Sequence, residues 1–95
     1  MRAYEVMYIL RPDLDEENIQ AMVDKFQGIV TDHGGEVTEL DKWGKRRLAY
    51  EINHVHDGYY VVMKFKADGD IAKELDRVLK ITDGVMRHLI IREDD

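Results

Sequence analysis

The 95-residue chain contains no cysteine and no serine, the two side chains that most often serve as nucleophiles in enzymes. Catalytic triads built on either residue are therefore excluded, and disulfide bonds cannot form. No hydrophobic run approaches the length of a membrane-spanning helix, and the first residues show no export signal. We therefore expect a cytoplasmic protein that is not an enzyme and that uses no membrane, cofactor, metal or small-molecule substrate.

Proline occurs once, and the sequence holds neither a repeat nor a low-complexity stretch, so residues 1–95 are predicted to form a single domain. Apolar residues that alternate with a period of two predict strands at residues 1–10, 37–52, 59–67 and 85–92. Apolar residues at helical spacing predict two helices. These should run from a cap at Asp15 to Gly34 and from Asp70 to Thr82.

This order, strand-helix-strand-strand-helix-strand, indicates an α+β fold. With right-handed crossovers it gives the ferredoxin-like βαββαβ arrangement, in which a four-stranded antiparallel sheet carries two helices on one face. The other sheet face is then left to water or to a partner. The strand residues expected to face the helices are Val6, Tyr8, Leu10, Val37, Leu48, Tyr50, Ile52, Val61, Met63, Phe65 and Ile90.

The phase of the second strand changes along its length. In a regular strand, odd-numbered and even-numbered residues point to opposite faces. Val37 is odd-numbered, whereas Leu48 and Tyr50 are even-numbered, although all three are expected in the core. A strand gains a residue where it changes the parity that faces the core. We therefore predict a β-bulge, and Gly44 is the natural position for it.

Positive charge is concentrated in one place in an otherwise acidic chain. The formal net charge is -6, yet residues 42–47 hold four of the 14 lysines and arginines. Cations on a rigid strand suit phosphate contacts, because their backbone is already fixed. The alternative is a charged strand edge that discourages aggregation. Trp43 favours a binding surface, since an indole beside four cations can stack or anchor.

The predicted helices and strands also differ in charge. From Asp13 to Glu36 the chain has seven acids and one lysine, so a polyanion should be repelled by the helical side and attracted to the sheet side. The candidate RNA-binding residues are Arg2, Lys45, Arg46, Arg47, Arg87 and Arg92. The apolar strand residues that point away from the helices are candidates for binding a protein partner. With the tryptophan of the cluster added, the candidate partner-binding residues are Trp43, Ala49, Tyr60, Val62, Leu89 and Ile91.

Other kinds of site fit the sequence less well. His54 and His56 have a spacing that metals use, but no cysteine or fixed third ligand accompanies them. The loop after the first strand contains Arg11, as in acylphosphatase-type phosphate sites, but it has two acids and no glycine. The third strand lacks the glycine-aromatic signature of RNA-recognition motifs, although Tyr60 is placed to stack a base. A small-ligand regulatory module of the same topology, which would form dimers, remains the alternative.

Three segments together carry a family resemblance. They are RAYE at residues 2–5, WGKRRLAYEI at residues 43–52 and GYY at residues 58–60. Over essentially its whole length the chain closely resembles the family of bacterial small-ribosomal-subunit protein six. The resemblance implies the ferredoxin-like fold and a structural role in the small subunit. It also implies binding to the central domain of the small-subunit ribosomal RNA, as a heterodimer with ribosomal protein eighteen.

Overall fold

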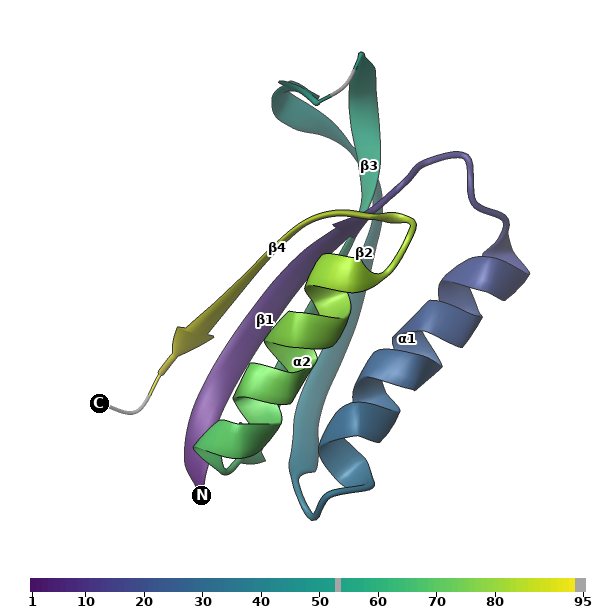
Figure 1. The fold of residues 1–95 in the computed structure, drawn as a ribbon. Helices are drawn as coiled ribbons and strands as arrows, with labels where there is room; N and C mark the ends of the chain where they lie inside the picture. Colours follow the sequence, from purple (N-terminus) through teal and green to yellow (C-terminus); the bar gives the residue numbers. More distant parts are fainter. Residues whose placement is uncertain (53, 94–95) are drawn as a thin grey trace.

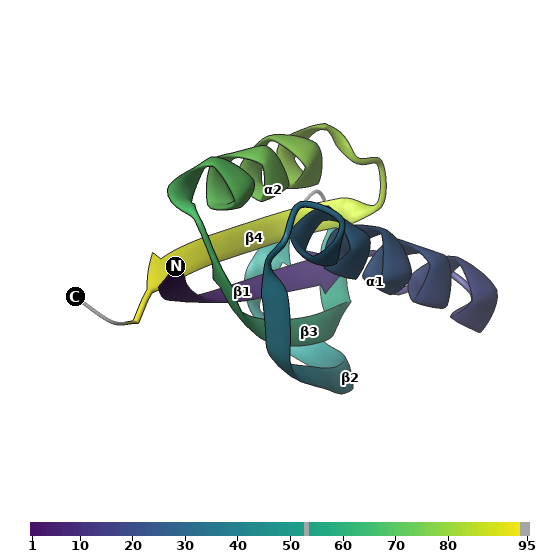
Figure 2. The same cartoon turned by 90° about the horizontal axis from the view of Figure 1, so that it is seen from below.

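The architecture was analysed in a computed structural model that describes residues 1–52 and 54–93 (Figure 1). The strands form one antiparallel sheet in the order β2-β3-β1-β4, and both helices cover the same face of it (Figure 2). This arrangement confirms the predicted ferredoxin-like α+β fold. The elements in chain order are β1 (Arg2–Leu10), α1 (Glu16–Thr31), β2 (Glu36–Ile52), β3 (Val55–Ala67), α2 (Gly69–Ile81) and β4 (Val85–Arg92).

Local capping fixes where the first helix begins and ends. Asp15 is the N-cap, and its carboxylate accepts a hydrogen bond of 2.8 Å from the backbone N–H of Asn18. After the helix the chain turns at Gly34, whose φ of +89° is a conformation that glycine adopts without strain. The predicted limits of α1 are therefore confirmed to within a few residues, as are those of α2.

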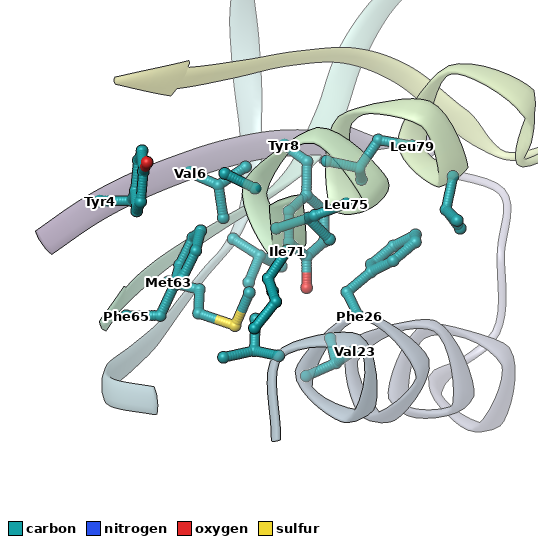
Figure 3. Packing of buried hydrophobic residues seen from close by; sticks show 14 of the residues in the cluster. Tyr4, Val6, Tyr8, Val23, Phe26, Met63, Phe65, Ile71, Leu75 and Leu79 are labelled. Carbon is teal, nitrogen blue, oxygen red and sulfur yellow. The ribbon is translucent and has the colours of Figure 1, made fainter. Parts of the chain in front are cut away.

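The core lies between the two helices and the sheet (Figure 3). The ring of Tyr8 meets Phe26 of α1 edge to face, with ring centroids 4.9 Å apart. Every predicted helix-facing residue outside the second half of β2 is buried in this core or packs against it. The largest fully buried side chains are Val6, Tyr8, Leu10, Val23, Phe26, Val30, Val61, Met63, Phe65, Leu75 and Leu79.

One polar atom is enclosed in this core. The hydroxyl of Tyr8 is buried and has no hydrogen-bond partner among the described residues. Burial raises the pKa of this hydroxyl well above its ordinary value of 10.0, and the nearby Tyr59 and Asp24 add to the rise. The neutral, protonated form of Tyr8 is therefore the one that the fold accommodates.

β2 contains two bulges in its first half. Its register against β3 slips at Thr38 and again at Trp43, so that each slip adds one residue to β2. Gly44, beside the second bulge, has a φ of +85°, which confirms the predicted bulge at this glycine. Each added residue switches the helix-facing side chains of β2 between odd-numbered and even-numbered residues. After two added residues, odd-numbered residues face the helices again, as Val37 does.

The prediction that Leu48, Tyr50 and Ile52 face the helices is therefore wrong. All three line a hollow on the opposite, open face of the sheet, together with Met7 and Ile9 of β1. The bulge at Gly44 alone would have directed Leu48 into the core, but the additional bulge at Thr38 returns it to the open face, and Tyr50 and Ile52 lie at a third register shift, between Arg47 and Ile52. Tyr50 is accordingly exposed.

The end of the β2–β3 hairpin extends past the helices (Figure 1), and its residues Leu48, Tyr50 and Ile52 border the hollow of the open face. The Tyr50 hydroxyl accepts a hydrogen bond from the guanidinium of Arg87 on β4, the strand at the far edge of the sheet. Beneath the hairpin, Ile9 is only 4% exposed and Leu48 only 8%. β3 begins at Val55, so the predicted turn over residues 53–58 is too long; residue 53 lies outside the described residues.

Candidate RNA and protein interface

The basic cluster lies on the arm of the hairpin formed by β2. Lys45, Arg46 and Arg47 are exposed and are paired across the strands with Tyr59, Gly58 and Asp57 of β3. None of the three cations forms an ion pair with a carboxylate within residues 1–52 and 54–93. Their charge is therefore not neutralised inside the described chain, and it is held on a paired strand rather than on a loose loop.

The fourth cation of the cluster has a different environment. The Nζ of Lys42 donates a hydrogen bond of 2.6 Å to Oε1 of Gln20 on α1. Its register places it on the helix side of the sheet, opposite Val61. Lys42 thus links β2 to the helix layer and is separated from the three cations beyond the bulge.

The other predicted RNA-binding residues divide between two ends of the sheet. Arg87 lies close to the hairpin, with its Cζ 5.2 Å from the ring centroid of Tyr50. Arg2 and Arg92 lie at the opposite end of the strands, where they pair with Ala67 and Tyr4. The structure therefore brings four of the six predicted residues to the hairpin end and places the other two elsewhere.

An aromatic pair stands beside the basic cluster on the open face. The rings of Trp43 and Tyr60 are stacked, with centroids 6.1 Å apart and planes inclined by 10°. The guanidinium of Arg46 lies over the indole, with Cζ 5.2 Å from the ring centroid. The indole N–H donates a hydrogen bond of 3.2 Å to Asp41. The sequence indicated Trp43 and Tyr60 as separate candidates, but it did not predict that their rings stack, because this contact depends on the bulge.

The predicted partner-binding residues all lie on or beside the open face, but they differ in accessibility. Leu89 and Ile91 of β4 are 57% and 45% exposed, and Ala49 is also exposed. Val62 is only 8% exposed, so it offers little surface of its own. Between the hairpin and Leu89 the face is hollowed by a cavity of about 260 Å³, which also borders Met7.

The less favoured sites do not assemble into chemical centres. The carboxylate of Glu51 lies 3.6 Å from His54 and 3.9 Å from His56, and no group of three or more potential metal ligands occurs in the part of the chain that the structure describes. Arg11, the candidate phosphate ligand, is paired at 3.0 Å with the carboxylate of Asp13 in its own loop. None of the described helices is long and apolar enough to cross a membrane.

Comparison with known proteins places this geometry in a family. The family model described as Ribosomal protein S6 matches residues 3–92. Small ribosomal subunit protein bS6 of Desulforudis audaxviator is 61% identical over 94 residues, which cover 99% of this chain and 100% of the relative. The protein of the same name from Carboxydothermus hydrogenoformans is 56% identical over 94 residues, with 99% and 98% of the two chains covered.

A solved structure agrees with these sequence matches. The crystal structure of 30S ribosomal protein S6 from Thermotoga maritima resembles this fold with a TM-score of 0.91 at 30% sequence identity, covering 97% of this chain and 87% of that chain. The relatives are structural ribosomal proteins, which confirms the prediction that the chain is not an enzyme. The chain therefore belongs to the ribosomal protein S6 family of the bacterial small ribosomal subunit.

Proposed function

We propose that this protein is a structural component of the small ribosomal subunit, located on ribosomes in the bacterial cytoplasm. In this role it binds the central domain of the small-subunit ribosomal RNA together with ribosomal protein eighteen, as a heterodimer, and supports subunit assembly and translation. The family supports the ribosomal role. The RNA and the partner protein are inferred from the chemistry of the surface and from the resemblance in sequence.

The observation that carries the RNA-binding role is the unneutralised charge of Lys45, Arg46 and Arg47. These side chains are exposed on a strand whose backbone is fixed by pairing to β3. A phosphate that they contact replaces condensed counterions, and the release of those ions favours binding. Arg87 lies near the hairpin and can extend the same positive surface.

The acidic composition of the chain explains why a partner is needed. With a formal net charge of -6, the protein as a whole repels a polyanion, and its cluster of cations is small. A basic partner would neutralise more phosphates and would also be attracted to the acidic chain. We therefore expect RNA affinity to be low for the protein alone and higher for the heterodimer.

For the partner we propose the exposed apolar side chains of β4. Leu89 and Ile91 lie on the open face, next to the cavity beneath the hairpin. Apolar side chains that lie close together on a small protein commonly mark a site of protein association. Trp43, Ala49 and Tyr60 border the same face, whereas Val62 can contribute only where its neighbours leave it accessible.

The test of the proposed function uses the heterodimer and a central-domain RNA fragment. Replacing Lys45, Arg46 and Arg47 with alanine should weaken RNA binding while the chain remains folded. The slope of log affinity against log salt should become shallower by about 0.7–0.9 for each phosphate that the variant no longer neutralises. The matched control replaces Lys73, Arg77 and Lys80 on α2, which removes the same charge from the helix side. Equal reductions in affinity in the two variants would contradict the proposal, because only net charge would then matter.

A further inference from the structure

We propose that Trp43 and Tyr60, with Arg46, form a stacking platform for an unpaired RNA base. This inference rests on the proposed function and names the part of the RNA that the hairpin recognises. It assigns Trp43 and Tyr60 to the RNA, whereas sequence analysis placed them among the partner-binding residues. The ligand is an unpaired nucleotide of any base, because every base presents a flat aromatic face.

The geometry of the three side chains suits this ligand. The planes of Trp43 and Tyr60 differ by only 10°, so together they form one layered aromatic surface. Trp43 is 42% exposed even with Tyr60 stacked on it and Arg46 over its ring, so part of the residue is accessible at the surface. Arg46 adds a flat guanidinium over the indole, and guanidinium planes stack on bases as aromatic rings do.

The fold holds the platform in place before any ligand arrives. Trp43 is the extra residue of the second β2 bulge, and bulges redirect a side chain relative to the strand. The adjacent Gly44 pairs directly with Tyr60, which sets the two aromatic residues next to each other across the strands. The indole N–H is held by the carboxylate of Asp41. Because the rings are already oriented, binding a base costs little side-chain entropy.

The charges around the platform favour RNA over an apolar protein anchor. Lys45, Arg46 and Arg47 follow Trp43 within four positions, and the carboxylates beside them are those of Asp41, which accepts the indole N–H, and Asp57, which is paired across the strands with Arg47. Apolar anchors of protein interfaces lie in patches depleted of charge, whereas Trp43 lies beside this cluster of cations. A nucleotide whose base stacks on Trp43 would instead place its phosphates near these cations. Because β2 is an edge strand, the cations on either of its faces lie along the same edge of the sheet.

The test uses the fluorescence of Trp43, which is the only tryptophan of the chain. Single-stranded oligoadenylate should quench its emission. Duplex RNA and inorganic polyphosphate of equal charge should not, since the first hides its bases in the helix and the second has none. In the heterodimer with a central-domain RNA fragment, Trp43→Phe supplies the background emission of the partner.

A binding measurement completes the test. Trp43→Leu keeps an apolar side chain but removes the aromatic face, and it should weaken binding of the heterodimer to the RNA fragment by at least about fivefold. Tyr60→Leu should weaken it in the same direction. Thermal melting of both variants identifies any loss of folding, and the quenching experiment on the unaltered chain remains informative even then.

The outcomes separate this inference from the proposed function. If the RNA fragment binds the heterodimer but leaves Trp43 emission and the affinity of Trp43→Leu unchanged, the platform is wrong and the ribosomal RNA-binding role stands. If ribosomal protein eighteen alone shifts the emission and RNA causes no further change, Trp43 is a protein anchor and the platform is again wrong. If the RNA fragment does not bind the heterodimer, both proposals fail.

Discussion

Tyr50 and Arg87 meet across the open face of the sheet although they belong to its two opposite edge strands. Arg87 donates a hydrogen bond to the Tyr50 hydroxyl, and its Cζ lies 5.2 Å from the centroid of the ring. In the strand order β2-β3-β1-β4, two strands, β3 and β1, lie between the strand that carries Tyr50 and the strand that carries Arg87. The contact therefore ties the basic hairpin to β4 across a face where Ile9 of β1 and Leu48 of the hairpin are both buried.

We predict that Tyr50→Ala releases the end of the hairpin. Removing the cation-π interaction should lower the free energy of unfolding by about 0.5–1 kcal/mol, because the interaction is exposed. The methyl groups of Ile9 and Leu48 should become accessible to a soluble paramagnetic probe in NMR spectra. Tyr50→Phe is the matched control, since it keeps the ring under Arg87 and removes only the hydroxyl. Unchanged methyl accessibility in Tyr50→Ala would show that the hairpin is held by other interactions.

The left-handed conformation of Gly44 predicts a large effect of a small substitution. Gly44→Val should destabilise the fold by more than ~1 kcal/mol, because a β-branched residue is strained at a φ of +85°. A Cβ at this position would meet no atom within 4 Å, so the expected cost comes mainly from the backbone conformation. Urea denaturation would measure it. As a control, Gly28→Ala inside α1 should instead stabilise by about 0.5–1 kcal/mol, because the new methyl group would lie in ordinary contact, 3.5 Å, with the Asp32 carboxylate.

Tyr8 provides a prediction about pH. Because burial raises the pKa of its hydroxyl, the folded state resists the ionisation that the unfolded state undergoes above about pH 10. The unfolded state then binds fewer protons, so Tyr8 contributes a loss of stability as pH rises through that range. Tyr8→Phe removes this loss, and it should be neutral or stabilising at pH 7, since the buried hydroxyl has no partner among the described residues.

The measurement is the free energy of unfolding of both proteins from about pH 7 to about pH 11. The two curves should separate above about pH 10, with Tyr8→Phe the more stable. A destabilisation of more than ~1 kcal/mol at pH 7 would mean that the hydroxyl makes a favourable interaction in solution.

The apolar surface of β4 predicts how partner binding can be abolished. Ile91→Glu should reduce the affinity for ribosomal protein eighteen, measured by calorimetry, and leave the isolated chain folded, because nearly half of the Ile91 side chain is exposed. The cost in unfolding free energy should stay near or below ~1 kcal/mol. Val62→Glu serves as a contrast. Its site is buried, so the charge should destabilise the chain itself. Unaltered partner affinity in a folded Ile91→Glu protein would place the partner elsewhere.

The sequence by itself determined the order of the elements, the capping of α1 at Asp15 and the bulge at Gly44. Each depends on residues that are neighbours along the chain: an acid ahead of an apolar stripe, or a glycine inside a strand pattern. The family resemblance also came from the sequence, because it rests on continuous segments such as residues 43–52. These features require no knowledge of which strands pair.

Only the tertiary structure decided which face Leu48 and Tyr50 occupy. The bulge at Thr38 has no glycine to signal it; the Thr38 hydroxyl donates a hydrogen bond of 3.2 Å to the carbonyl of Lys64 on β3. Such a bulge is set by the register between strands far apart in sequence, and one extra residue reverses every side chain that follows. The meeting of Tyr50 with Arg87 and the stacking of Trp43 on Tyr60 both follow from that register, so neither can be obtained from local pattern alone.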